Sequence, residues 1–252
     1  MYEKAQLAFE NYMKNYDLTN PLISLKYKHT YEVVELMGEL SFRLNLNKED
    51  MILAKVIGLL HDIGRFEQIK KYNMISDKKT NMDHAEYGYQ YLFLEHHIQD
   101  FGINEESTEA MIIGKAILNH SKYKIDTNLS ERELLFTKMI RDMDKVDIFR
   151  VLALENNEVF KASEVTESVL KEFSLEHSID NNTIKTDTDK TLARLAFIFD
   201  INFEESFDIL VNTDNFDFYL SMVEVAEDSE KLWKKVREIC FDKINRGILE
   251  NE

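Results

Sequence analysis

The stretch LLHDIGRFE, residues 59–67, decides the fold. It places a histidine and an aspartate, His61 and Asp62, directly after an apolar run. That run belongs to a predicted helix that begins after the N-cap candidate Asn47 and is apolar around nearly its whole circumference, with Gly64 expected to stop it. Because a buried imidazole or carboxylate without a partner is costly, other residues must compensate for this pair.

The composition predicts an all-α protein. Only one proline and seven glycines occur in 252 residues, and 44% of the chain is hydrophobic. The density of acidic and imidazole groups in apolar surroundings drops beyond about residue 155. We therefore expect a core helical bundle over residues 1–155 that carries the chemistry, and a C-terminal helical lobe over residues 156–252 that packs on it.

The charge limits the partners. A formal net charge of -16 argues against binding to a nucleic-acid backbone, which requires clustered Lys and Arg. A phosphorylated small molecule would also be repelled, unless a bound cation reversed the sign locally. The single cysteine, Cys240, forms no internal disulfide, and no apolar run of about 18 residues suggests a membrane span. We expect a cytoplasmic protein without a membrane partner, and a homodimer is compatible with the sequence.

Three further histidines lie beside apolar helix faces or at helix ends. His29 shares a face with Val33 and Leu40 in one predicted helix. Asp83 is expected to cap a helix that places His84 at its first position. His120 ends a helix that begins near Ser107. A lone histidine of this kind is more often a hydrogen-bonded core residue than a metal ligand, but four such residues in separate helices can converge.

The predicted ligands suit a divalent transition metal. Imidazole and carboxylate groups together bind Fe, Mn, Co, Ni or Zn, whereas a thiolate site lacks cysteines. The remaining three histidines lie in polar contexts and are expected at the surface: His96, His97 and His177.

A carboxylate ligand is also available on a long helix that starts with the capping box Ser130-Glu131-Arg132-Glu133. Helical periodicity does not choose between Asp142 and Asp144, because the faces of both look buried. Asp147 follows one turn later. Asp142 and Asp147 either orient a ligand imidazole or pair with neighbouring basic residues.

These residues resemble a known pattern. His29, the doublet His61-Asp62 in HDIGR, and Asp144 in RDMDKVDIF are similar to the H…HD…D motif of the HD-domain superfamily of metal-dependent phosphohydrolases. The order and spacing match from residue 22 to about residue 152. The segments DHAEYGYQYL and AILNHSKYK further resemble a bacterial branch of that superfamily.

The resemblance implies the ligand set. His29, His61, Asp62 and Asp144 would bind one metal, and His84 and His120 would bind a second, with Asp62 bridging. The cofactor would be one or two divalent ions of Mn, Fe, Co, Ni, Mg or Zn. Alternatively, His84 or His120 would donate a hydrogen bond to a phosphate or act as a general acid.

Two residues of the opening stretch are catalytic candidates. Asp62 would orient the attacking water or accept its proton. Arg65 could hold a phosphate oxygen, because its planar donors fit two oxygens at a time. The alternative for Arg65 is a salt bridge to Glu67 or another acid.

The predicted activity is metal-dependent hydrolysis of a phosphomonoester, a phosphodiester or a nucleotide, with a phosphorylated small molecule or nucleotide as substrate. Two other functions stay open on the same residues: a di-iron oxygenase, and a non-catalytic regulator that binds a nucleotide. After His120 the chain has Ser121-Lys122 instead of the doubled histidine and glycine-tyrosine-proline signature of cyclic-dinucleotide phosphodiesterases, so that substrate is disfavoured.

Overall fold

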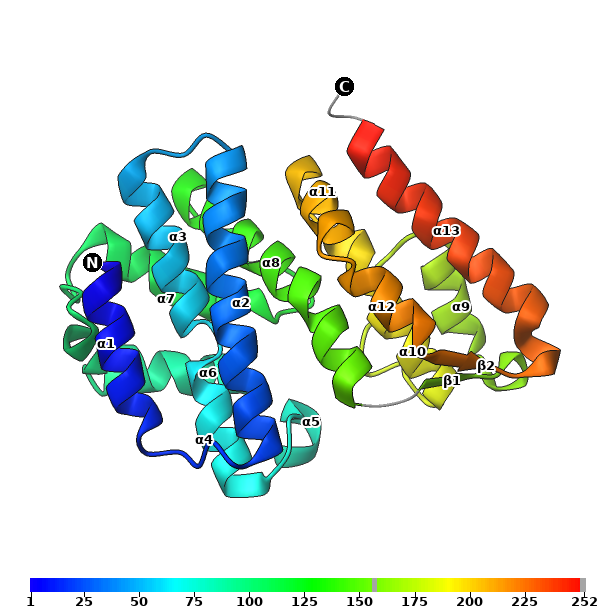
Figure 1. The fold of residues 1–252 in the computed structure, drawn as a ribbon, viewed down its shortest axis with the longest axis horizontal. Helices are drawn as coiled ribbons and strands as arrows, with labels where there is room; N and C mark the ends of the chain where they lie inside the picture. Colours follow the sequence, from blue (N-terminus) through cyan, green and yellow to red (C-terminus); the bar gives the residue numbers. More distant parts are fainter. Residues whose placement is uncertain (156–157, 250–252) are drawn as a thin grey trace. The chain divides into compact units, whose positions relative to one another are not determined.

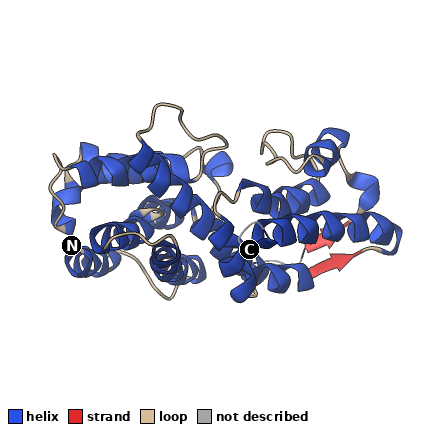
Figure 2. Cartoon of the chain, turned by 90° about the horizontal axis from the view of Figure 1, so that it is seen from above, coloured by secondary structure: helices blue, strands red, loops and turns tan. Residues whose placement is uncertain are grey.

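The computed structural model describes residues 1–155 and 158–249, which form two compact units, Met1–Asp144 and Lys145–Glu252. Nearly all of the regular structure is helical (Figures 1 and 2), so the prediction of an all-α protein is confirmed. The expected limit of the chemistry at residue 155 stays a prediction. In the described residues, no helix combines the length and the apolar character needed to cross a membrane.

The first unit is a helical bundle. Helices α2 and α3 lie side by side, with α1 packed on α3 (Figure 1). The elements are α1 (Tyr2–Met13), α2 (Pro21–Arg43), α3 (Lys48–Leu60), α4 (Ile63–Tyr72), α5 (Asp77–Thr80), α6 (His84–Tyr89), the π-helical turn η1 (Gln90–Leu94), the 3₁₀ helix η2 (His97–Phe101), α7 (Thr108–His120) and α8 (Glu131–Glu155), of which α8 continues into the second unit.

Side-chain caps fix where these helices begin, as the sequence predicts. Asn47 accepts hydrogen bonds from the first turn of α3, Asp83 does so for α6, and Ser107 for α7. Ser130 and Glu133 exchange hydrogen bonds with each other's backbone N–H groups, which completes the predicted capping box of α8.

The corner between α3 and α4 carries the His61-Asp62 doublet. Asp62 has φ −107° and ψ 17°, a sparsely populated backbone region, and α4 begins at the next residue. The expectation that Gly64 stops the helix is wrong, because Gly64 lies inside α4. It is needed for close packing on α6: a Cβ at this position would lie 2.2 Å from the carbonyl oxygen of His84.

Helix α1 supports the same corner. The Tyr12 hydroxyl donates a hydrogen bond of 3.0 Å to the carbonyl oxygen of Ile63, and the Tyr16 hydroxyl lies 2.6 Å from that of Tyr12. The rings of Phe9, Tyr12 and Tyr16 surround Phe66 of α4. The first turn of α4 is therefore held by α6 on one side and by α1 through an aromatic cluster.

The second unit is mainly helical, with one short pair of parallel strands in which Val159 is opposite Glu224 (Figure 2). Its elements are the C-terminal part of α8, β1 (Glu158–Phe160), η3 (Ala162–Glu164), α9 (Glu167–Ser174), α10 (Asp187–Leu195), η4 (Ala196–Asp200), α11 (Glu204–Asn212), α12 (Asn215–Ser221), β2 (Val223–Val225), η5 (Glu227–Ser229) and α13 (Glu230–Leu249).

Candidate metal centre

The first unit brings together all six residues predicted as metal ligands. They come from five places in the chain: α2, the α3–α4 corner, α6, α7 and α8. Five of the six are buried, and Asp144 is the exception, with 21% of its side chain exposed. Buried imidazoles and carboxylates require partners, and here they are each other's neighbours. The residues are His29, His61, Asp62, His84, His120 and Asp144.

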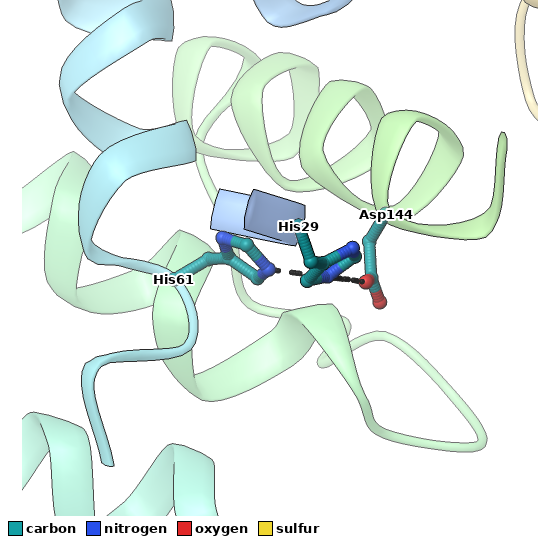
Figure 3. Close-up of side chains that lie close together, drawn as sticks. All are labelled: His29, His61 and Asp144. Atoms are coloured by element: carbon teal, nitrogen blue, oxygen red, sulfur yellow. Dashed lines mark hydrogen bonds and ion pairs between the residues drawn. The ribbon is translucent and has the colours of Figure 1, made fainter. Parts of the chain in front are cut away.

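One cluster consists of His29, His61 and Asp144, whose side chains point toward one another from α2, the end of α3 and α8 (Figure 3). The Nε2 atom of His29 lies 3.1 Å from Oδ1 of Asp144, and the Nε2 atom of His61 lies 3.8 Å from the same oxygen. The structure therefore brings Asp144 to the histidines, as the resemblance implied and as periodicity alone did not decide.

The second cluster consists of Asp62, His84 and His120. The Oδ1 atom of Asp62 lies 3.2 Å from Nε2 of His84 and 3.7 Å from Nε2 of His120. The two imidazoles face each other, with their Nε2 atoms 3.0 Å apart.

Asp62 connects the two clusters. While its Oδ1 faces the second cluster, its Oδ2 lies 3.7 Å from Nε2 of His29 and 3.6 Å from Nε2 of His61. One carboxylate thus offers one oxygen to each group of imidazoles, which is the arrangement required of a bridging ligand.

Hydrogen bonds at Nδ1 fix the orientation of three imidazoles. His61 donates to the carbonyl oxygen of Gly58 and His120 to that of Ile117, both at 2.7 Å. His84 donates to the carboxylate of Asp77 at 2.8 Å. Because each acceptor has no proton to give, the proton of each neutral ring is assigned to Nδ1, and the lone pair of Nε2 faces the centre.

This donor set fits a divalent cation. Two Nε2 lone pairs at 3.0 Å, those of His84 and His120, repel each other unless a positive charge lies between them. Two nitrogens about 2.0–2.1 Å from one ion and at a right angle would be about 2.9 Å apart, close to this separation. Among the described residues, the buried Nε2 atom of His61 has no hydrogen-bond partner, which fits a metal ligand.

Burial and charge set the protonation states. Burial lowers the pKa of His61 to about 3, so its ring is neutral near pH 7. Burial opposes ionisation of Asp62 too, but the Lys26 ammonium outweighs it and holds the pKa of that carboxyl well below its usual value. Burial is likewise outweighed at Asp144, where His29 lowers the pKa of the carboxyl.

The sequence interpretation missed Lys26. Its Nζ atom lies 2.6 Å from Oδ2 of Asp62, and both side chains are almost fully buried. Lys26 precedes His29 by three residues, so the two share a face of α2. That spacing was the available signal, but a lysine beside an apolar helix face is usually interpreted as solvent-exposed.

Arg65 also lies beside the second cluster and forms a salt bridge to an acid, which was the alternative expected for it, and that acid is Asp77. The arginine's Nη1 atom donates to Asp77 at 2.5 Å and to Gln68 at 2.7 Å, and its Nε lies 3.6 Å from Oδ1 of Asp62. Neither Asp77 nor Gln68 was predicted. Asp77 lies at the first position of the short helix α5.

The remaining candidates lie outside both clusters. Asp142 is fully buried, and Asp147 pairs with Arg150, which is the simpler of its two predicted roles. Three histidines form ion pairs with acids at or near the surface, as expected for their polar contexts: His96, His97 and His177.

A family model described as HD domain matches residues 27–200, more than half of the chain. The chain belongs to the HD-domain family. This membership places it in a superfamily of metal-dependent phosphohydrolases. The matched range contains all six clustered residues and begins after α1, so the aromatic support from Tyr12 lies outside it. No curated protein and no solved structure gives a significant match to this HD-domain chain.

Proposed function

We propose that this HD-domain protein hydrolyses a phosphate ester, whether a phosphomonoester, a phosphodiester or a nucleotide, at one or two divalent metal ions. The ions would be Mn, Fe, Co, Ni, Mg or Zn. The observation that carries the proposal is the position of Asp62, which offers one oxygen to His29 and His61 and the other to His84 and His120.

The ligands would divide into two groups. His29, His61 and Asp144 would hold the first ion, and His84 and His120 the second, with Asp62 shared. A divalent cation supplies two things here: it lowers the pKa of a bound water from 15.7 to about 7, and it polarises a phosphoryl oxygen. In the hydrolysis, the water oxygen forms a bond to phosphorus, and the ester oxygen leaves with a proton.

The protein's own groups would complete the reaction. Asp62, held ionised by Lys26, is placed to orient the attacking water or to accept its proton. The buried Nε–H of Arg65 lies 3.6 Å from Oδ1 of Asp62 and has no hydrogen-bond partner in the described part of the chain. That donor is available to an oxygen of the substrate.

The charge distribution favours a small substrate. Asp144 and Asp77 are the more exposed acids of the site, with 21% and 31% of their side chains accessible. A net charge of -16 disfavours nucleic-acid backbones, so the proposal names a phosphorylated small molecule or nucleotide as partner. We propose no membrane partner. A measurement of the mass in solution would test whether the protein forms a homodimer.

The test combines metal analysis of the purified protein with a panel of phosphatase and phosphodiesterase substrates, using Asp62→Ala as the matched variant. We expect the wild-type protein to contain metal and to release phosphate or nucleotide. Asp62→Ala should lose both properties while its far-ultraviolet circular dichroism stays helical. Retention of metal and activity in this variant would overturn the proposal.

Two outcomes would favour the other functions. A coloured, redox-active iron protein that requires oxygen for turnover would indicate a di-iron oxygenase on the same ligands. Tight nucleotide binding without turnover across several metals would indicate a regulator. Turnover with Mn or Co in the absence of oxygen separates the proposed hydrolase from both.

A further inference from the structure

Asp77 contacts both a candidate ligand of the second ion, His84, and the candidate phosphate donor, Arg65. It lies at the first position of α5, and its side chain is 31% exposed. Its Oδ2 atom accepts the Nδ1–H of His84 at 2.8 Å. Its Oδ1 atom accepts from Nη1 of Arg65 at 2.5 Å and from Nε2 of Gln68 at 2.9 Å.

Gln68 holds this segment in place from the interior. It is fully buried on α4, and its amide nitrogen also lies 2.9 Å from the Thr80 hydroxyl and 2.9 Å from the carbonyl oxygen of Met82. Its Oε1 atom accepts from Arg65 at 2.7 Å. The residues that lead from α5 into α6 are therefore tied to α4, and Asp77 is set at a fixed place beside His84.

The two oxygens of Asp77 have different consequences. The bond to Nδ1 of His84 leaves the lone pair of Nε2 facing Asp62 and His120. The bond to Nη1 of Arg65 leaves the Nε–H of the guanidinium on the side of Asp62, where no described residue forms a hydrogen bond with it. Each oxygen of the Asp77 carboxylate thus accepts from a different partner.

We propose that Asp77 is a positioning residue that aligns the second metal site with the phosphate-binding donor, through His84 and Arg65 at once. The proposal rests on the proposed function, because His84 is assigned there as a metal ligand. A carboxylate behind a ligand imidazole commonly changes metal affinity by 10–100-fold. Here the same carboxylate also fixes a substrate contact, so one substitution should change two separate measurements.

Asp77→Asn tests this with almost no change in volume. A carboxamide has a single oxygen acceptor, so it cannot accept from His84 on one side and from Arg65 on the other. The matched control is Asp50→Asn. Asp50 lies away from both clusters and, like Asp77, accepts hydrogen bonds from an arginine, in this case two from Arg132.

The first measurement is metal binding by titration calorimetry with Mn²⁺. For Asp77→Asn we expect the site held by His84 and His120 to lose Mn²⁺ affinity by about 10–100-fold. The affinity of the site held by His29, His61 and Asp144 should change little. The second is steady-state kinetics, in which the variant should have a raised KM from the misplaced Arg65 and a lowered kcat from the weakened second site. Asp50→Asn should behave like the wild-type protein in both.

A third measurement needs no metal. The ¹⁵N chemical shifts of the His84 ring in the metal-free protein should report a proton on Nδ1 in the wild type and in Asp50→Asn, and a proton shifted toward Nε2 in Asp77→Asn. Unchanged ring shifts, Mn²⁺ affinities and KM in Asp77→Asn would overturn the role of Asp77 alone. A wild-type protein that binds no metal would instead overturn the proposed function.

Discussion

Asp62 and Asp189 are both buried aspartates near the start of a helix, but their surroundings differ completely. Asp189, in the first turn of α10, accepts hydrogen bonds from the backbone N–H of Thr166, Lys185 and Thr186 and from the Thr166 hydroxyl, at 2.6–3.2 Å. Asp62 instead faces one ammonium and the Nε2 atoms of four histidines.

The difference teaches how a structural acid can be told from a functional one. The oxygens of Asp189 accept hydrogen bonds from backbone N–H groups and from one hydroxyl, as expected of a capping residue. Besides the charged groups of Lys26 and Arg65, Asp62 faces imidazoles, and three of these accept at Nε2 because their Nδ1 protons are engaged, so this set of ligands suits a bound cation. Burial of an acid alone therefore carries no functional information, whereas the chemistry of its neighbours does.

The largest expected effect is that substitutions at these two residues change different properties of the protein. Asp62→Asn should lose bound metal and activity by more than the 10–100-fold typical of residues that only support a ligand. Asp189→Asn should retain metal and activity but lose about 1–3 kcal/mol of stability, because a carboxamide leaves at least one N–H unsatisfied. Metal analysis, turnover and urea unfolding measure the three quantities.

The comparison would fail if the two variants behaved alike. Loss of metal in Asp189→Asn, with its circular dichroism unchanged, would mean that α10 contributes to the site. Full metal content in Asp62→Asn would mean that the shared carboxylate does not bind the ions.

The sequence predicted the helical class and the six clustered residues because both depend on local or motif signals. Helix caps such as Asn47 and Asp83 act on residues two or three positions away, and the H…HD…D pattern has a characteristic order. Asp189 was not predicted from the sequence. Only its contacts with Thr166, 23 residues earlier, show its role.

The supporting residues of the site could not be predicted for a similar reason. Lys26 meets Asp62 across 36 residues, and Asp77 meets Arg65 across 12. Apart from the three-residue spacing between Lys26 and His29, nothing in their own neighbourhoods distinguishes them from surface charges. The role of Gly64 was also misjudged, because a glycine after a helix suggests a stop, whereas the close approach of α6 is visible only in three dimensions.

The second prediction removes the counter-charge of Asp62. Lys26→Met leaves a buried carboxylate without its ammonium, which should destabilise the metal-free protein by about 3–5 kcal/mol. Added Mn²⁺ should restore part of that loss, because a bound cation supplies the missing charge. Urea unfolding with and without Mn²⁺ measures both effects.

Lys122→Met is the control for that experiment. Lys122 pairs with Asp126 at 2.9 Å, but about 40% of each side chain is exposed, so the loss should be at most about 1 kcal/mol and should not respond to Mn²⁺. Equal effects of the two substitutions would show that the ammonium of Lys26 has no special relation to Asp62.

The third prediction concerns acid. Burial opposes ionisation of Asp189, but its hydrogen bonds from Thr166, Lys185 and Thr186 prevail and lower its pKa below the unfolded value of about 3.9. Its contribution to stability is therefore complete above that value and is lost as the pH falls through it, because the unfolded chain then takes up the proton first. The stability advantage of wild type over Asp189→Asn should shrink between about pH 5 and pH 2. A constant difference over that range would contradict the lowered pKa.

The smallest expected effect comes from Tyr12, which supports the corner at Asp62 through the backbone of Ile63. Tyr12→Phe removes the hydroxyl that donates to the carbonyl oxygen of Ile63, the residue after Asp62, at a cost of about 1 kcal/mol. Because α1 fixes the first turn of α4, Mn²⁺ affinity should fall only a few-fold, far less than in Asp62→Asn. Tyr27→Phe, which loses a bond of 2.9 Å to Glu10, should leave that affinity unchanged. If Tyr12→Phe lowered stability without changing Mn²⁺ affinity, the hydroxyl would stabilise the bundle but would not position the doublet.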